Sequence, residues 1–166
     1  SARLRAEIVA RLGLTLPAVV APMFLVSGPG LVAAACGQGM ASAFPSLNAR
    51  TTAELEDWLR VLNAATAGPG HAAYGVNLVT HRSNPRFAAD LDACARARVP
   101  LVITALGSPA PAVAAVHGWG GLVLADVNTP RLARKAAEAG ADGLILVCAG
   151  AGGHTGLITP FAFVDE

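Results

Sequence analysis

Residues 122–147, LVLADVNTPRLARKAAEAGADGLILV, carry the pattern that decides the fold. The apolar runs 122–125 and 143–147 predict two buried strands. Between them, Thr129 and Pro130 stand where a helix cap and a first helical position are expected, and Gly140 marks a helix end. Because uninterrupted apolar strands are buried on both faces, this segment predicts two parallel strands joined by a helix.

The same strand–helix unit recurs along the whole chain. Strands are expected at 19–22, 40–44, 74–79, 99–105, 122–125 and 143–147. Helices are expected at 30–36, from 51 or 52 to 65, from Pro85 onward, at 109–117, from 129 to Gly140, and from 161 to 166. This alternation predicts an α/β fold with a parallel sheet.

Two α/β architectures fit such a repeat. A doubly wound sheet is complete with five or six strands, whereas a (β/α)8 TIM barrel needs eight. The last expected helix begins at 161 and runs into the final residue of the sequence. This favours a barrel of which about six units are present: a single domain over 1–166, incomplete at its C-terminal end.

Composition limits the classes of protein to consider. Of the 166 residues, 54% are hydrophobic and only 14% are charged, against about 25% charged in average soluble domains. A hydrophobic content this high argues against disorder. The net charge of +1 gives no electrostatic reason to expect a nucleic acid or an anionic membrane as partner. The low charge suggests that surface is buried against something else or that part of the protein is missing, and it leaves a homo-oligomer open.

Cysteine usage and targeting patterns point to the cytoplasm. Cys36, Cys94 and Cys148 form no Cys-x-x-Cys motif, so neither a disulfide framework nor a zinc site is indicated. Arginines before the apolar run 12–26 resemble a leader peptide, but prolines interrupt that run. No uninterrupted apolar run reaches the length of about 18 residues that a membrane span needs.

In both architectures ligands gather at the carboxyl ends of the strands. The most informative segment there is 150–156, GAGGHTG, which follows the sixth expected strand. Glycines let a backbone approach a flat or anionic ligand closely, and His154 would face that ligand. The segment lacks the Gly-Lys-Ser/Thr ending of a phosphate loop and the glycine spacing of a dinucleotide fingerprint. The alternative is a glycine-rich surface loop with a solvated His154.

Other polar residues at these ends have plain structural interpretations. Cys148 and His154 could form a thiol–imidazole pair, but a small apolar residue at a strand end is the favoured interpretation of Cys148. Arg82 and Arg86 could hold an anion or cover the start of a helix. His81 is more consistent with a binding or loop residue than with a catalyst. The histidines and acids show no metal-ligand spacing, so no metal site is expected.

Four segments together resemble one family: VAPM at 20–23, GVNL at 75–78, AGAD at 139–142 and AGGHTG at 151–156. They occur in the family's order, each at an expected strand boundary. The sequence resembles the nitronate monooxygenases, formerly called 2-nitropropane dioxygenases, and the related flavin-dependent enoyl-acyl-carrier-protein reductases. The resemblance covers residues 16–166.

The resemblance implies a (β/α)8 barrel that holds FMN without a covalent bond. His154 matches the catalytic histidine of the family. The matched cofactor-binding positions are the backbone of Ala21, Pro22 and Met23, the Asn77 side chain, the Gly152 amide, and Gly153 beside it.

The implied activity is the oxidation of alkyl nitronates or nitroalkanes with O2 to carbonyl compounds and nitrite. One alternative is NAD(P)H-dependent reduction of an enoyl thioester, toward which residues 103–107 lean. A second is a barrel piece that binds no flavin and serves as a scaffold. The sequence departs from the family at Val147, where a glutamine that bonds the flavin is common. The glycine-rich loops that grip the FMN phosphate would lie after Glu166.

Overall fold

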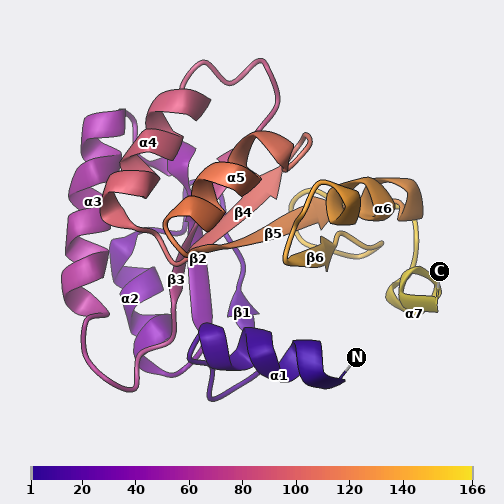
Figure 1. Ribbon diagram of the computed structural model, residues 1–166, viewed down its shortest axis with the longest axis horizontal. Coiled ribbons are helices and arrows are strands. Elements are labelled where there is room, and N and C mark those ends of the chain that lie inside the picture. Colours follow the sequence, from indigo (N-terminus) through magenta and orange to yellow (C-terminus); the bar gives the residue numbers. More distant parts are fainter. Residues whose placement is uncertain (1, 166) are drawn as a thin grey trace.

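The computed structural model describes residues 2–165, with side chains from residue 6 onward. Six parallel strands form one sheet in the order β1-β2-β3-β4-β5-β6 (Figure 1). The strands are β1 (Val19–Val20), β2 (Ala41–Pro45), β3 (Tyr74–Val79), β4 (Leu101–Ala105), β5 (Leu122–Val127) and β6 (Gly143–Leu146). Each strand pairs with the next one along the chain, so the sheet has no reversal of strand order. A doubly wound sheet needs such a reversal, and the prediction of a partial (β/α)8 barrel is confirmed.

Helices follow the strands, as the sequence predicts. They are α2 (Pro29–Gly37), α3 (Thr52–Ala65), α4 (Phe87–Ala97), α5 (Ala110–Gly118), α6 (Pro130–Glu138) and α7 (Pro160–Asp165), with a 3-10 turn at Ser46–Asn48. Figure 1 shows α2, α3 and α4 side by side along one side of the sheet. Glu166, the last residue of the expected helix at 161–166, lies outside the described residues.

The sheet is buried on both faces because its side chains alternate between two apolar clusters. The outer cluster joins α2–α5 to Phe44, Tyr74, Val76, Leu78, Val102 and Val123. The inner cluster contains Ala43, Leu101, Ile103, Leu122 and Leu124. Adjacent positions such as Val102 and Ile103 therefore face opposite sides of the sheet. A third cluster joins β5 to α6 and to Phe163 of α7.

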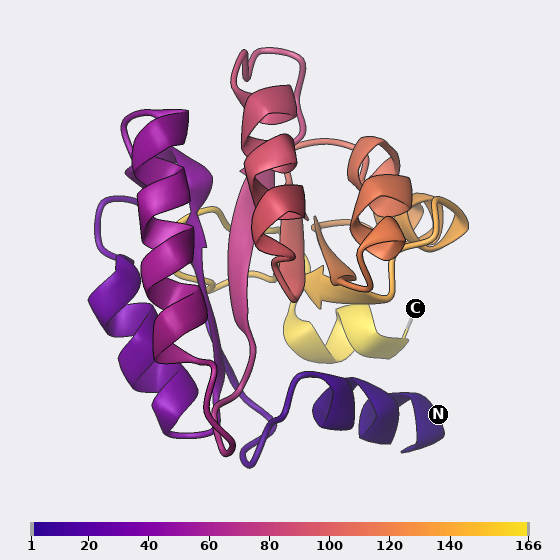
Figure 2. The ribbon, with the colours of Figure 1, turned by 60° about the vertical axis from the view of Figure 1, so that its left-hand side comes forward.

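An additional helix, α1 (Ala2–Arg11), covers the inner face at the amino ends of the strands. Ile8, Leu12 and Leu14 pack against the inner cluster, and the guanidinium of Arg11 donates to the Gly120 carbonyl at 3.4 Å. Figure 2 shows α1 running beneath the curled sheet. From sequence, the arginines of this segment indicate only a leader-like pattern, and no helix is predicted here. Its apolar stripe is too short to stand out from the arginines around it.

Several predicted boundaries are confirmed by local contacts. The Thr51 hydroxyl accepts from the Glu54 amide at the start of α3, and the Thr129 hydroxyl accepts from the Leu132 amide at the start of α6. Several other boundaries differ by one or two residues. The first strand has two residues rather than four, and α4 begins at Phe87 rather than at Pro85. Residues 84–86 form a turn instead, since the Asn84 side chain accepts from the Arg86 amide at 3.1 Å.

One buried carboxylate connects three outer elements. Asp90 of α4 accepts from the Thr52 hydroxyl of α3 at 2.8 Å and from the Arg86 guanidinium at 3.0 Å. Arg86 also donates to the Ala49 carbonyl at 2.7 Å. Arg86 is therefore held by contacts within the fold. Of its two interpretations, holding an anion or covering the start of a helix, these contacts favour the second.

Candidate functional site

The carboxyl ends of all six strands lie at one edge of the sheet, because every pair of strands is parallel. We call this the carboxyl edge and the opposite one the amino edge. The residues expected to form the site lie on three parts of the carboxyl edge. Met23 follows β1, Asn77 lies on β3, and His154 lies in the loop after β6.

The loop after β1 presents a run of exposed apolar side chains. Phe24, Leu25 and Val26 are 64%, 79% and 65% exposed, and Met23 before them is 39% exposed. Leu25 also has a φ of 62°, a left-handed conformation that favours glycine. An exposed and strained apolar loop next to a ligand-binding edge is an unusual arrangement that points toward a functional role.

Asn48, from the 3-10 turn after β2, holds this loop in place. Its Nδ2 donates to the carbonyls of Met23 at 3.0 Å and Ser27 at 2.8 Å, and its Oδ1 accepts from the Leu25 amide at 2.9 Å. The left-handed conformation costs a non-glycine residue about 1–2 kcal/mol. Each hydrogen bond contributes about 0.5–1.5 kcal/mol net, so three of them offset the strain at Leu25. The sequence analysis did not identify Asn48, whose only signal was a polar residue shortly after a predicted strand.

Asn77 is buried and faces the inner side of the sheet. It pairs in register with Ile103 of β4, an inner-cluster residue, and its Nδ2 donates to the Ile103 carbonyl at 3.2 Å. This bond fixes the plane of the amide and commits one of its N–H groups. The inward orientation fits the expected cofactor contact.

The loop after β6 is closed at its base by hydrogen bonds to one carbonyl. The Gly156 amide and the Thr155 hydroxyl donate to the Cys148 carbonyl at 3.2 Å and 3.0 Å. A Cβ at Gly156 would collide with the Val147 carbonyl oxygen, so only glycine fits there. Within the loop Gly153 has a φ of 75°, and His154 is exposed.

Asp126, near the end of β5, lies close to the carboxyl edge and has no role predicted from the sequence. Its register partner is Ile145 of β6, which packs against the inner cluster. Burial raises the pKa of the Asp126 carboxyl to about 6, and the nearby His154 cation lowers this pKa in part. The two residues are therefore electrostatic neighbours. The available signal was a single acid within an apolar strand.

Cys148 does not have the environment of a reactive thiol. It is buried against Ala125, Val127 and Phe163 in the third apolar cluster, and its Sγ donates to the Leu146 carbonyl at 3.3 Å. The interpretation as a small apolar residue at a strand end is confirmed.

The other histidines take part in local contacts. His81 Nδ1 contacts the Ser83 hydroxyl at 2.8 Å, and His117 Nε2 contacts the Asp142 carboxylate at 2.9 Å. Across residues 2–165 no group of three or more His, Cys, Asp or Glu side chains could hold a metal ion. In the same part of the chain, none of the helices combines the length and hydropathy needed to cross a bilayer.

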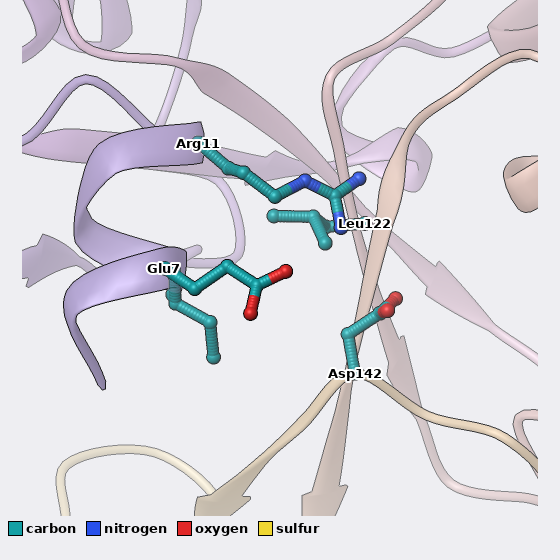
Figure 3. Close-up of a pocket in the computed structure, with 5 residues that line it drawn as sticks. Glu7, Arg11, Leu122 and Asp142 are labelled. Carbon is teal, nitrogen blue, oxygen red and sulfur yellow. The ribbon is translucent and has the colours of Figure 1, made fainter. Parts of the chain in front are cut away.

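A pocket at the amino edge is shown in Figure 3. Glu7, Ile8 and Arg11 of α1 line it together with Leu122 and Asp142. Asp142 is already engaged there, since its Oδ2 accepts from the Val123 amide at 2.7 Å. This pocket lies at the opposite end of the strands from the candidate site.

No protein-family model matches the chain, and no curated protein matches it in sequence. Several solved structures are similar. FabK from Thermotoga maritima is 26% identical with a TM-score of 0.85, over 96% of this chain and 49% of that one. Nitroalkane oxidase from Streptomyces ansochromogenes is 24% identical with a TM-score of 0.77, over 89% of this chain and 51% of that one. The chain thus spans about half the length of these proteins.

A third structure shares the fold at lower identity. It is the enoyl reductase domain of MlnA from the macrolactin biosynthesis cluster of Bacillus amyloliquefaciens, 18% identical with a TM-score of 0.68, over 78% of this chain and 32% of that one. The fold of the chain is thus similar to the folds of these three proteins, and at that level the predicted resemblance to the nitronate monooxygenase-like family is confirmed.

Proposed function

We propose that the chain is an FMN-binding TIM-barrel domain of a flavin-dependent oxidoreductase that oxidises alkyl nitronates or nitroalkanes with O2. The observation that carries the proposal is the carboxyl edge. An exposed apolar loop, an inward amide and a glycine loop bearing a histidine lie there on separate strands, at the positions matched to the family. The similarity to nitroalkane oxidase and FabK supports it.

The residues at this edge fit the ring system of a flavin. Exposed apolar side chains after β1 offer a surface for a flat ring, and Asn77 offers polar atoms at the inner face. The position of a Cβ at Gly152 has open space around it, so a ligand can approach the backbone. When bound, FMN would supply the electron acceptor that no side chain provides.

Each candidate residue then has a defined task. The backbone of Ala21, Pro22 and Met23 lies along the ring, and Asn77 and the Gly152 amide, with Gly153 beside it, hold the cofactor through hydrogen bonds. Val147 has no polar side-chain atom, so this position contributes no side-chain hydrogen bond to the flavin. The hydrogen bonding of the flavin at this position, or the redox tuning of the flavin, then differs from the pattern common in the family.

His154 is the proposed catalytic residue. In its protonated form it stabilises the negative charge of a nitronate, and in its neutral form it accepts a proton from a nitroalkane. Its exposed position in a glycine-rich loop makes it accessible to a small substrate.

The second candidate function is NAD(P)H-dependent reduction of an enoyl thioester. The similarity to FabK over 96% of the chain favours it. Anaerobic stopped-flow spectra of the flavin distinguish the two. We expect propyl-2-nitronate to bleach the flavin and NADH to leave it oxidised, whereas bleaching by NADH assigns the reductase activity.

A third candidate, a scaffold that binds no flavin, is tested by the purified protein itself. We expect a yellow protein whose visible absorbance corresponds to about one FMN per chain. A colourless protein that also fails to take up added FMN would contradict the flavin enzyme and leave the scaffold.

A further inference from the structure

We propose that Asn48 is a positioning residue that shapes the loop at residues 21–27 before the flavin binds. The proposal rests on the proposed function, because it concerns the same cofactor surface. Asn48 does not come from the loop itself but from the 3-10 turn after the neighbouring strand. It thus connects the ends of β1 and β2 at the carboxyl edge.

The hydrogen bonds of Asn48 use both ends of its amide. The Nδ2 group donates to Met23 and Ser27, at the two ends of the exposed run, while Oδ1 accepts from Leu25 in its middle. An aspartate would lose both donated bonds, and an alanine would lose all three. Asparagine therefore fits this position because it combines donor and acceptor groups.

The loop adds a second, internal contact. The Ser27 hydroxyl accepts from the Met23 amide at 2.9 Å, and the Met23 carbonyl also accepts from the Val26 and Ser27 amides at 3.2 Å and 3.0 Å. Both backbone polar groups of Met23 are therefore engaged within the loop and with Asn48. Met23 is then left to contact the flavin ring through apolar atoms.

The contacts of Asn48 do not serve the apolar core. The side chains that they hold in place, those of Phe24, Leu25 and Val26, are mostly exposed. Fixing an exposed strained loop orders it in advance, so that a ligand does not lose affinity to the ordering of that loop. The geometry therefore points to preorganisation of a binding surface.

The test compares Asn48→Ala with Asn63→Ala, a matched control. Asn63 also makes two side-chain hydrogen bonds, donating to the Ala97 carbonyl at 3.0 Å and accepting from the Tyr74 hydroxyl at 2.7 Å. It lies on α3, and its partner Tyr74 is the first residue of β3, at the amino edge. The control thus removes similar bonds away from the loop.

Two quantities are measured on the purified protein. The first is amide hydrogen exchange in residues 21–28 without flavin, and the second is the dissociation constant of added FMN from fluorescence quenching. We expect Asn48→Ala to speed exchange in this segment and to weaken FMN binding about 10-fold to 100-fold, because all three hydrogen bonds that order the loop are lost and part of that ordering must then accompany binding. Asn63→Ala should leave both quantities at the wild-type values.

The outcomes separate the inference from the proposed function. Faster exchange with wild-type FMN affinity in Asn48→Ala would overturn the positioning role while leaving the flavin enzyme intact. Absence of FMN binding by the wild-type protein itself would overturn both. If Asn48→Ala fails to fold, Ser27→Ala removes the single bond to the Met23 amide. It should then weaken FMN binding by a smaller factor, and unchanged binding would contradict the inference.

Discussion

The amino and carboxyl edges of the same sheet differ in how far their side chains are buried and hydrogen-bonded. At the amino edge Leu12 is buried under the strands, and the Asp142 carboxylate bonds both the Val123 amide and the His117 ring. At the carboxyl edge Leu25 and its neighbours are exposed. At the amino edge α1 packs on the inner cluster and leaves a pocket beside Leu122 and Asp142, whereas the carboxyl edge presents a run of apolar side chains after β1 to the surroundings.

Left-handed backbone occurs toward both edges. Leu25 at 62° and Leu106 at 57° lie at the carboxyl edge and are exposed, whereas Arg98 at 51° ends α4 just before β4, toward the amino edge. Asp126, close to the carboxyl edge, carries a carboxyl group whose pKa burial raises. Strained backbone and perturbed carboxyl groups concentrate at functional sites. The comparison supports a division in which the amino edge contributes stability and the carboxyl edge carries the proposed ligand chemistry, the placement usual in barrel enzymes.

The sharpest test of this division substitutes one histidine at each edge. His154→Ala should lower nitronate-dependent O2 consumption by a factor of about 10² to 10⁴, because it removes a general acid–base group. The flavin should stay bound. His71→Ala removes an exposed histidine before β3 whose ring hydrogen-bonds the Gly68 carbonyl at 3.2 Å, and turnover should not change. Equal turnover in the two variants would end the assignment of chemistry to the carboxyl edge.

A pair of leucine substitutions tests how the amino edge contributes to stability. Leu12→Ala empties a buried position in the inner cluster and should lower the free energy of unfolding by about 2–5 kcal/mol, measured by urea denaturation. Leu16→Ala, at a leucine that is 52% exposed, should change it by less than about 0.5 kcal/mol. A Leu12→Ala protein as stable as wild type would show that the segment just after α1 contributes little to the stability of the amino edge.

The parts of the fold predicted from sequence depend on local patterns. The strand at Tyr74–Val79 matches the prediction residue for residue, and Thr51 and Thr129 cap their helices as expected. Strand periodicity and capping involve residues within a few positions of each other, so the sequence displays them directly. The same holds for Cys148, whose apolar neighbours in sequence indicated its burial.

The unpredicted parts depend on contacts between distant residues. Asn48 holds a loop more than twenty residues before it, and the charge of His154 influences the pKa of the Asp126 carboxyl across two neighbouring strands, β5 and β6. No spacing rule connects such pairs. Likewise, the apolar side chains in and just after α1 pack against inner-cluster residues that lie far away in the sequence. The sequence thus located the candidate edge but not the contacts that organise it.

Asp126 gives a pH test of the same edge. Because the pKa of its carboxyl in the folded protein, about 6, lies above the ordinary value of 3.8, protonation favours folding. This stabilisation is complete below pH 3.8 and is lost as the pH rises through 6. Between those limits the wild type should lose on the order of 2 kcal/mol relative to Asp126→Asn, measured by urea denaturation at each pH.

His154 provides the internal control for that measurement. In a His154→Ala background the cation that lowers the pKa of Asp126 is missing, so the loss of stability should move to higher pH. A difference between wild type and Asp126→Asn that stays flat from pH 4 to pH 7 would show that Asp126 is well solvated. The contrast between the two edges would then depend only on the exposed, strained loop at Leu25.

The smallest expected effect compares the two faces of the sheet near its carboxyl edge. Asn77 and Thr104 are both buried, and each donates to a strand carbonyl, Asn77 at 3.2 Å and Thr104 at 3.5 Å. Asn77 faces inward beside Ile103, whereas Thr104 alternates to the outer face. Asn77→Ala should weaken FMN retention in dialysis about tenfold, the equivalent of one hydrogen bond of about 1.4 kcal/mol. Thr104→Val should retain FMN like wild type, so equal losses in both variants would mean that retention reports sheet stability rather than a contact at the inner face.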